Sequence, residues 1–184
     1  MKEASDEELY RRMRKGDANA LEHLYRRYEP ALFRYALHMS GSHFTAEEVA
    51  HEVFVQLMAP KQGFQEQRGS LEGYLYGMAR NRLRMMQRVR TISALDEFEF
   101  PAGRTDALAD FIQGESVAAL QTALQELPEH YRDVVVLCEL EERSYEDAAR
   151  LLGCPVGTVR SRLSRARALL SAKLKPAKAT EALR

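Results

Sequence analysis

The chain has 184 residues, in which 27 Lys and Arg are balanced by 27 Asp and Glu, with 45% hydrophobic residues, 10 Gly, 6 Pro and 2 Cys. This composition suits one globular domain or two small ones, and it excludes collagen-like, disulfide-framework and low-complexity proteins. No apolar run approaches the roughly 20 residues of a membrane helix, and the N-terminal residues are charged where a secretory signal is apolar. We therefore expect a soluble cytoplasmic protein with no membrane insertion, no metal or cofactor, and Cys138 and Cys154 as buried reduced thiols.

Charge is unevenly distributed along the chain. Residues 68–90 carry six Arg and one Glu, residues 91–116 carry six acidic residues and one Arg, and residues 155–178 carry seven Lys and Arg with no acidic residue. Two basic stretches thus flank an acidic one, which favours two nucleic-acid-facing surfaces separated by a segment that a polyanion repels. Ordinary solvated helix faces are the alternative explanation.

Helical periodicity dominates the whole sequence, and no stretch alternates cleanly enough to indicate a strand. Ser5 with Glu8, and Thr45 with Glu48, have the spacing of a capping box, which predicts helices that start near residues 6 and 46. An apolar pattern at three-and-four spacing crosses Pro30, which predicts a helix that is kinked or divided there. The fold class is therefore predicted to be all-α.

Domain limits follow from where the periodicity fades. After the loop 59–69, Ser70 can cap a helix over residues 70–90, which completes a first helical domain. Acidic residues, Pro101 and Gly103 then indicate a flexible acidic linker before a second, smaller set of helices. We place the first domain at 1–92, the linker at 93–115, the second domain at 116–178 and a tail at 179–184.

The segment 144–170 has the pattern of a helix-turn-helix. Ser144 caps a first helix, Gly153 supplies the turn and Pro155 favours the start of a second helix. The residues expected to face inward are Ala148, Ala149, Leu152, Val159, Leu163, Ala166 and Leu170. The opposite face carries side chains that can bond guanine edges and phosphates in a major groove, which are Thr158, Arg160, Ser161, Arg162, Ser164 and Arg165.

Two parts of the chain together resemble a known family. Residues 124–167 resemble the C-terminal domain of extracytoplasmic-function sigma factors, and residues 45–57 followed by 69–88 resemble their N-terminal domain, in the same order. The resemblance implies an all-α protein without catalysis that binds bacterial RNA polymerase core and promoter DNA. It also implies an anti-sigma factor as a partner, which nothing in the sequence identifies.

The resemblance assigns polymerase binding to the helix 46–58, whose family counterpart binds a coiled coil of the polymerase clamp. The polar side chains that line one exposed side of this helix are Glu47, Glu48, Glu52 and Gln56. A merely solvated face is the alternative. We expect Phe54 to lie in the core rather than at the interface.

The resemblance assigns capture of single-stranded DNA at the minus-ten element to the helix 70–90 and the loop before it. Single-strand capture needs a basic track with stacking faces or pockets. The residues implied are Phe64, Tyr74, Arg80, Asn81, Arg84 and Arg88. Phe64 can either pack against an unstacked base or anchor the loop.

The second helix of the helix-turn-helix, 155–172, is the implied reader of the minus-thirty-five element. We expect Arg160, Ser161, Ser164 and Arg165 nearest the bases, with Lys173 and Lys175 beyond the reading surface. The acidic linker can mimic nucleic acid inside the polymerase or serve as a plain tether.

Two other classes of protein are alternatives to a sigma factor. A helix-turn-helix regulator that acts without polymerase would need only the second domain and would bind duplex operators tightly by itself. An enzyme has less support, because the five His residues form no metal-binding or paired-carboxylate pattern and no glycine-rich phosphate loop is present.

Overall fold

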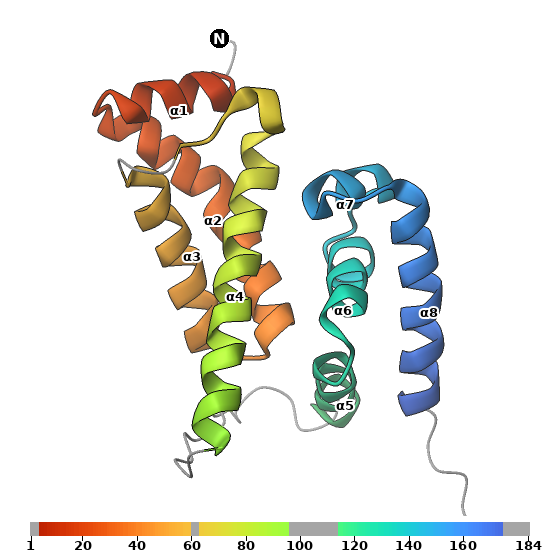
Figure 1. Ribbon diagram of the computed structural model, residues 1–184. Helices are drawn as coiled ribbons and strands as arrows, with labels where there is room; N and C mark the ends of the chain where they lie inside the picture. The colour runs from red at the N-terminus through yellow and green to blue at the C-terminus, as the bar shows by residue number, and fades with distance from the viewer. Residues whose placement is uncertain (1–3, 60–62, 96–113, 175–184) are drawn as a thin grey trace, which may run out of the picture. The chain divides into compact units, whose positions relative to one another are not determined.

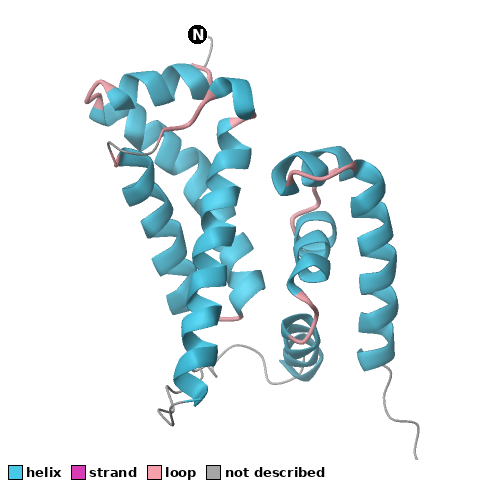
Figure 2. Cartoon of the chain, viewed as in Figure 1, coloured by secondary structure: helices cyan, strands magenta, loops and turns pink. Residues whose placement is uncertain are grey.

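The computed structural model describes residues 4–59, 63–95 and 114–174, and at 89–95 and 114–116 it describes the backbone alone. Every regular element in these ranges is helical, and no strand occurs in them (Figure 2). The chain forms two compact units, the first built from α1–α4 and the second mainly from α5–α8. The all-α fold with two helical domains is confirmed. The domain limits stay predictions, and residues 96–113 of the linker and the tail 179–184 lie outside the described residues.

Two helices of the first unit, α1 and α4, begin where the predicted caps place them (Figure 1). Ser5 accepts a hydrogen bond from the Glu8 N–H at 3.2 Å, and Ser70 accepts one from the Gly73 N–H at 3.1 Å. Each hydroxyl thus satisfies an amide that has no partner inside its own helix. The elements are α1 (Asp6–Arg14), α2 (Ala18–Ser40), α3 (His43–Met58), a 3₁₀ turn η1 (Glu66–Arg68) and α4 (Leu71–Leu95).

One predicted helix start is wrong, and of the two alternatives at Pro30, a kinked or a divided helix, the divided one is excluded. The predicted start near residue 46 is wrong, because α3 begins at His43 and Ser42 is its cap, accepting the Thr45 N–H at 3.3 Å. Pro30 does not divide α2, which runs through it without interruption. Tyr28 and Leu32 are buried on either side of Pro30, so core packing offsets the hydrogen bond that a proline lacks.

The core of the first unit forms where α2 packs against α3 and α4. Phe54 is 3% exposed and belongs to this core, as predicted. Full burial of an aliphatic or aromatic side chain contributes about 1.5–3 kcal/mol each. The residues that are most completely buried here are Leu24, Leu32, Tyr35, Met39, Val49, Val53, Leu57, Leu71 and Leu75.

The second unit contains the predicted helix-turn-helix. Ser144 accepts the Asp147 N–H at 3.0 Å, and Gly153 takes a left-handed conformation with φ of 63° in the turn, which a residue with a side chain adopts at a cost. Leu151 rather than Leu152 is buried in the first helix of the motif. The elements are α5 (Gly114–Gln125), α6 (Glu129–Val135), one π-helical turn η2 (Val136–Leu140), α7 (Tyr145–Leu152) and α8 (Val156–Leu174). The buried stripe of α8 is the one predicted, namely Val159, Leu163, Ala166 and Leu170.

A buried arginine caps the C-terminal end of α5 by donating hydrogen bonds to its last carbonyls. Arg132 on α6 is 6% exposed, and its Nε donates to the Leu124 carbonyl at 2.8 Å. The same guanidinium donates to the Leu127 carbonyl at 3.0 Å and to the backbone carbonyl and side chain of Gln125. The last carbonyls of a helix have no partner within the helix, so Arg132 satisfies groups that would otherwise be buried without a hydrogen bond.

Candidate nucleic-acid interface

The outer side of α8 carries a compact set of exposed polar side chains. Arg160, Ser161, Ser164 and Arg165 are exposed, whereas Thr158 is half-buried. They lie on the first half of the helix, away from its buried stripe. Recognition helices present this part to base edges, and arginine is the side chain that most often bonds guanine there. The geometry of α8 is therefore that of a helix that can enter a major groove.

Tyr145, which the sequence analysis did not select, helps to position this face. The guanidinium carbon of Arg160 lies 5.8 Å from the centre of the Tyr145 ring, a cation–π distance. Tyr145 is the first residue of α7, directly after the capping Ser144, so its place in the motif was the only available signal. Ser161 donates its hydroxyl proton to the Thr158 carbonyl at 3.0 Å, which leaves its oxygen lone pairs to accept.

Basic residues farther along α8 are engaged within the second unit. Arg167 forms an ion pair with Glu139 at 2.5 Å, and this hydrogen bond raises the pKa of Arg167. Lys173 forms an ion pair with Glu126, the residue directly after α5. Lys175 lies outside the described residues. The positive charge of the last two turns is thus partly compensated inside the protein, which favours the first half of α8 as the reading surface.

Three arginines recur every four residues on α4, namely Arg80, Arg84 and Arg88, but they are not equally exposed. Arg84 and Arg88 are exposed together with Asn81, whereas Arg80 is half-buried. The buried Nε of Arg80 has no hydrogen-bond partner in the part of the chain that the structure describes. Met85, 59% exposed, lies among these polar groups. This face combines cations, an amide and an apolar side chain, which suits a single strand with unstacked bases.

Phe64 of the loop packs against Tyr74 of α4 and against a third aromatic residue, Tyr10 of α1. The ring centre of Phe64 lies 5.5 Å from that of Tyr10 and 5.9 Å from that of Tyr74. Burial raises the pKa of Tyr74, so its phenol stays protonated. Phe64 is half-buried, so it anchors the loop and still exposes part of its ring. Contact with a base stays a prediction.

Among the described residues, some polar side chains on the outer face of α3 form contacts within the protein, and others do not. Glu47 is exposed, but Glu48 is half-buried and forms an ion pair with Arg82 of α4 at 2.5 Å. Gln56 donates a hydrogen bond to Glu52 at 3.0 Å. Sequence reasoning missed the apolar side chains that flank this face, because it assigned polar residues to the outside. They are Phe44, Val55 and Met58, which are 73%, 41% and 47% exposed.

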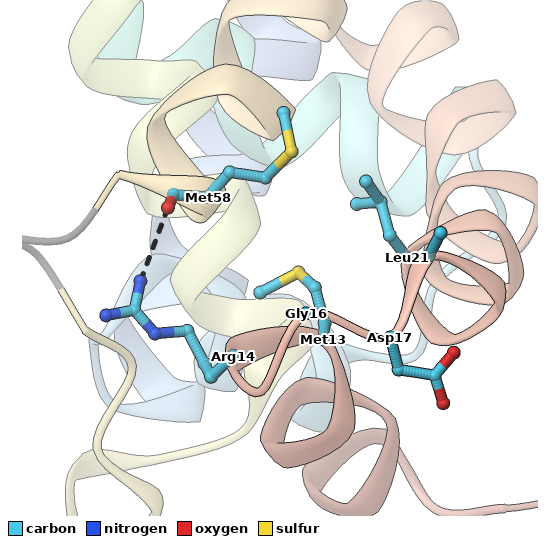
Figure 3. Close-up of a pocket in the computed structure, with 7 residues that line it drawn as sticks. Met13, Arg14, Gly16, Asp17, Leu21 and Met58 are labelled. Carbon is cyan, nitrogen blue, oxygen red and sulfur yellow. Dashed lines mark hydrogen bonds between the residues drawn. The ribbon is translucent and has the colours of Figure 1, made fainter.

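An open cleft of about 450 Å³ at the turn between α1 and α2 has Arg14 and Asp17 as its charged lining residues (Figure 3). No group of three or more potential metal ligands occurs among the described residues. Cys138 and Cys154 are free and half-buried rather than fully buried. In the described part of the chain, the helices are too short or too polar to span a bilayer.

Family models match both units of the chain. The Sigma-70 region 2 model covers residues 24–91, and the Sigma-70, region 4 model covers residues 118–170. The first match includes α3, the loop with Phe64 and most of α4, while the second includes the helix-turn-helix. Both candidate DNA-binding faces thus lie inside matched segments.

Curated proteins and a solved structure agree with these matches. The RNA polymerase sigma-H factor of Pseudomonas aeruginosa is 32% identical over 186 residues, covering 93% of this chain and 94% of that protein. The ECF RNA polymerase sigma factor SigE of Mycolicibacterium smegmatis is 32% identical over 160 residues, and the match spans 62% of its length. The sigma factor RpoE of Bartonella quintana, solved with the anti-sigma factor NepR, aligns with a TM-score of 0.60 and 28% identity over 82% of this chain and 93% of that one.

Proposed function

Because this chain belongs to the extracytoplasmic-function sigma factors of the sigma-70 family, we propose that it binds bacterial RNA polymerase core and directs it to promoters of a specific set of genes. The observation that carries this function is the presence of both sigma regions in order on one chain. A regulator that acts without polymerase would leave the match of the first unit unexplained. We assign no catalysis to the chain, and we place its action in the cytoplasm, where polymerase and promoter DNA are found.

Each candidate face receives one role in this proposal. The exposed first half of α8 reads the duplex minus-thirty-five element, with Arg160, Ser161 and Arg165 nearest the bases. The exposed face of α4 and the Phe64 loop bind the melted minus-ten strand. The outer face of α3 contacts polymerase core. Support for this division comes from the exposure of the cationic and amide groups and from their separation onto two helical units.

An anti-sigma factor is the proposed regulator. The Bartonella quintana relative was solved in complex with one. Exposed apolar side chains on α3 and α4, such as Val55, Met58 and Met85, are suited to a protein partner in the absence of polymerase.

Reconstituted transcription tests the function as a whole. Polymerase core mixed with this chain should bind it and give run-off transcripts from promoters that core alone does not use. DNA bound by the holoenzyme in the cell supplies the promoter templates. A chain that binds those templates tightly without core, and leaves run-off unchanged, would be a polymerase-independent regulator.

The first prediction separates Glu47 from Glu48 on α3. Glu47→Lys should weaken core binding about five- to thirtyfold, since it removes one attraction and adds a repulsion, each worth about 0.5–1 kcal/mol at an exposed site. Glu48 forms an ion pair with Arg82 inside the protein. Exchanging the two residues, as Glu48→Arg with Arg82→Glu, should therefore keep both the fold and the affinity for core. Titration of core with labelled protein measures both effects. Equal binding by Glu47→Lys and wild type would exclude Glu47 from the interface.

The second prediction concerns Asn81 on α4. Asn81→Ala removes an exposed amide that can bond a base edge, while leaving the arginines in place. Promoter melting by the holoenzyme should therefore fall more than closed-complex formation. Permanganate reactivity of the melted region measures melting, and a gel shift on duplex DNA measures the closed complex. Unchanged permanganate reactivity, both in Asn81→Ala and in an Arg84→Ala, Arg88→Ala double variant, would remove this face from the melting step.

A further inference from the structure

The loop that carries Phe64 is held by α1, a helix that precedes the segment matched by the region 2 family model. The phenol oxygen of Tyr10 accepts a hydrogen bond from the backbone N–H of Phe64 at 2.9 Å. The two rings meet edge to face, with an interplanar angle of 89°. Tyr10 is 7% exposed, so this hydrogen bond is shielded from water and fixes both the backbone and the ring of Phe64.

Two arginines of α1 contact the same loop on either side of Phe64. Arg14 donates to the Ala59 carbonyl at 2.8 Å and to the Met58 carbonyl at 3.4 Å, at the end of α3 where the loop begins (Figure 3). Arg11 lies 3.6 Å from the Glu66 carboxylate in the turn that leads to α4. Residues 10, 11 and 14 fall within about one helical turn, so one side of α1 holds the loop at its start, middle and end.

Of the three contacts, only the one made by Tyr10 acts on Phe64 itself among the described residues. Arg11 and Glu66 are both more than 45% exposed, and such ion pairs are weak. Arg14 acts on the end of α3, which its own helix already orders. Tyr10 instead bonds the backbone N–H of Phe64, and its ring packs against Phe64, which in turn contacts Tyr74.

We propose that α1 is a positioning element for the proposed minus-ten interface, with the Tyr10 hydroxyl as the group that preforms the Phe64 loop before DNA binds. This inference rests on the proposed function of the loop and α4. A loop already held in its binding conformation loses less conformational entropy when the strand binds. Preorganisation of the loop therefore increases the affinity for the single strand. Tyr10 itself touches no DNA in this account.

The test compares Tyr10→Phe with Tyr25→Phe in the full chain assembled into holoenzyme. Tyr10→Phe keeps the ring and removes only the hydroxyl. Tyr25 lies on α2 of the same unit, is 42% exposed and packs its ring against Phe54 rather than against the Phe64 loop, so it is a matched control. The probe is fluorescent single-stranded DNA, selected by wild-type holoenzyme from a randomised pool.

Tyr10→Phe should raise the dissociation constant for this single strand about five- to tenfold, the cost of one lost hydrogen bond, while Tyr25→Phe should not. Exchange of the Phe64 amide with deuterium should accelerate in Tyr10→Phe, and binding to the duplex minus-thirty-five element should stay unchanged. A lower melting temperature with wild-type affinity for the single strand would make Tyr10 a stability contact and overturn the inference. If Asn81→Ala also leaves that affinity unchanged, the proposed minus-ten interface fails; if only Tyr10→Phe does, the role of α1 alone fails.

Discussion

Replacing Arg132 with Met is expected to unfold most of the second unit at ordinary temperatures. The substitution removes several hydrogen bonds from a charged donor, each contributing about 1.5–3 kcal/mol, and leaves buried carbonyls at the end of α5 without a donor. We expect a loss of at least about 3 kcal/mol. A unit of about 60 residues has a free energy of unfolding of only about 3–9 kcal/mol, so this loss is a large fraction of it.

Deuterium exchange along the full chain locates the effect, since amides of α7 and α8 should lose protection while those of α2 and α3 keep theirs. Arg165→Met is the matched control, because it makes the same chemical change at an exposed position and should shift stability by less than about 0.5 kcal/mol. Equal protection in the two variants would show that Arg132 does not hold the second unit together.

The largest expected effect on promoter choice comes from Arg165 and Arg160. An arginine bonded to guanine contributes about 1–3 kcal/mol of discrimination, so Arg165→Ala should relax the preference at one or two base pairs of the upstream element. Arg160→Ala should do the same at neighbouring positions. Tyr145 should add to the role of Arg160 by holding its guanidinium in place. Selection by holoenzyme from promoters with a randomised upstream element gives the preferred sequence for each variant.

Lys173→Ala is the control for these substitutions. Lys173 lies on the same helix but is paired with Glu126, about two turns beyond Arg165, so its loss should leave the preferred sequence unchanged. Wild-type preference in both Arg165→Ala and Arg160→Ala would mean that this face does not read bases. Unchanged preference with uniformly weaker binding would make these arginines phosphate contacts instead.

Local signals in the sequence predicted most of the fold. The caps at Ser5, Ser70 and Ser144 depend on residues only three positions away, so a linear pattern contains all the information that they need. The cap of α3 was predicted wrongly because Ser42 and Thr45 are both good capping residues. The choice between them is made by packing, which buries Thr45 in the first turn.

Contacts between distant parts of the sequence could not be predicted in this way. Glu48 has the spacing of an outward-facing residue, yet Arg82, 34 residues later, binds it. Tyr10 and Phe64 are 54 residues apart, and only the packing of α1 over the loop brings the phenol to the amide. Such pairs decide which polar groups remain available to a partner. The sequence therefore predicted which side of each helix is a candidate face. It did not predict which residues on that side already form contacts within the protein.

Promoter selection from a fully randomised template most directly tests the claim that two units of one chain read two promoter elements. Core polymerase with the wild-type chain should select two separate sequence blocks at a fixed spacing. Arg165→Ala should alter only the upstream block, and Asn81→Ala only the downstream one. A single selected block, or blocks that appear equally well without this chain, would contradict the account.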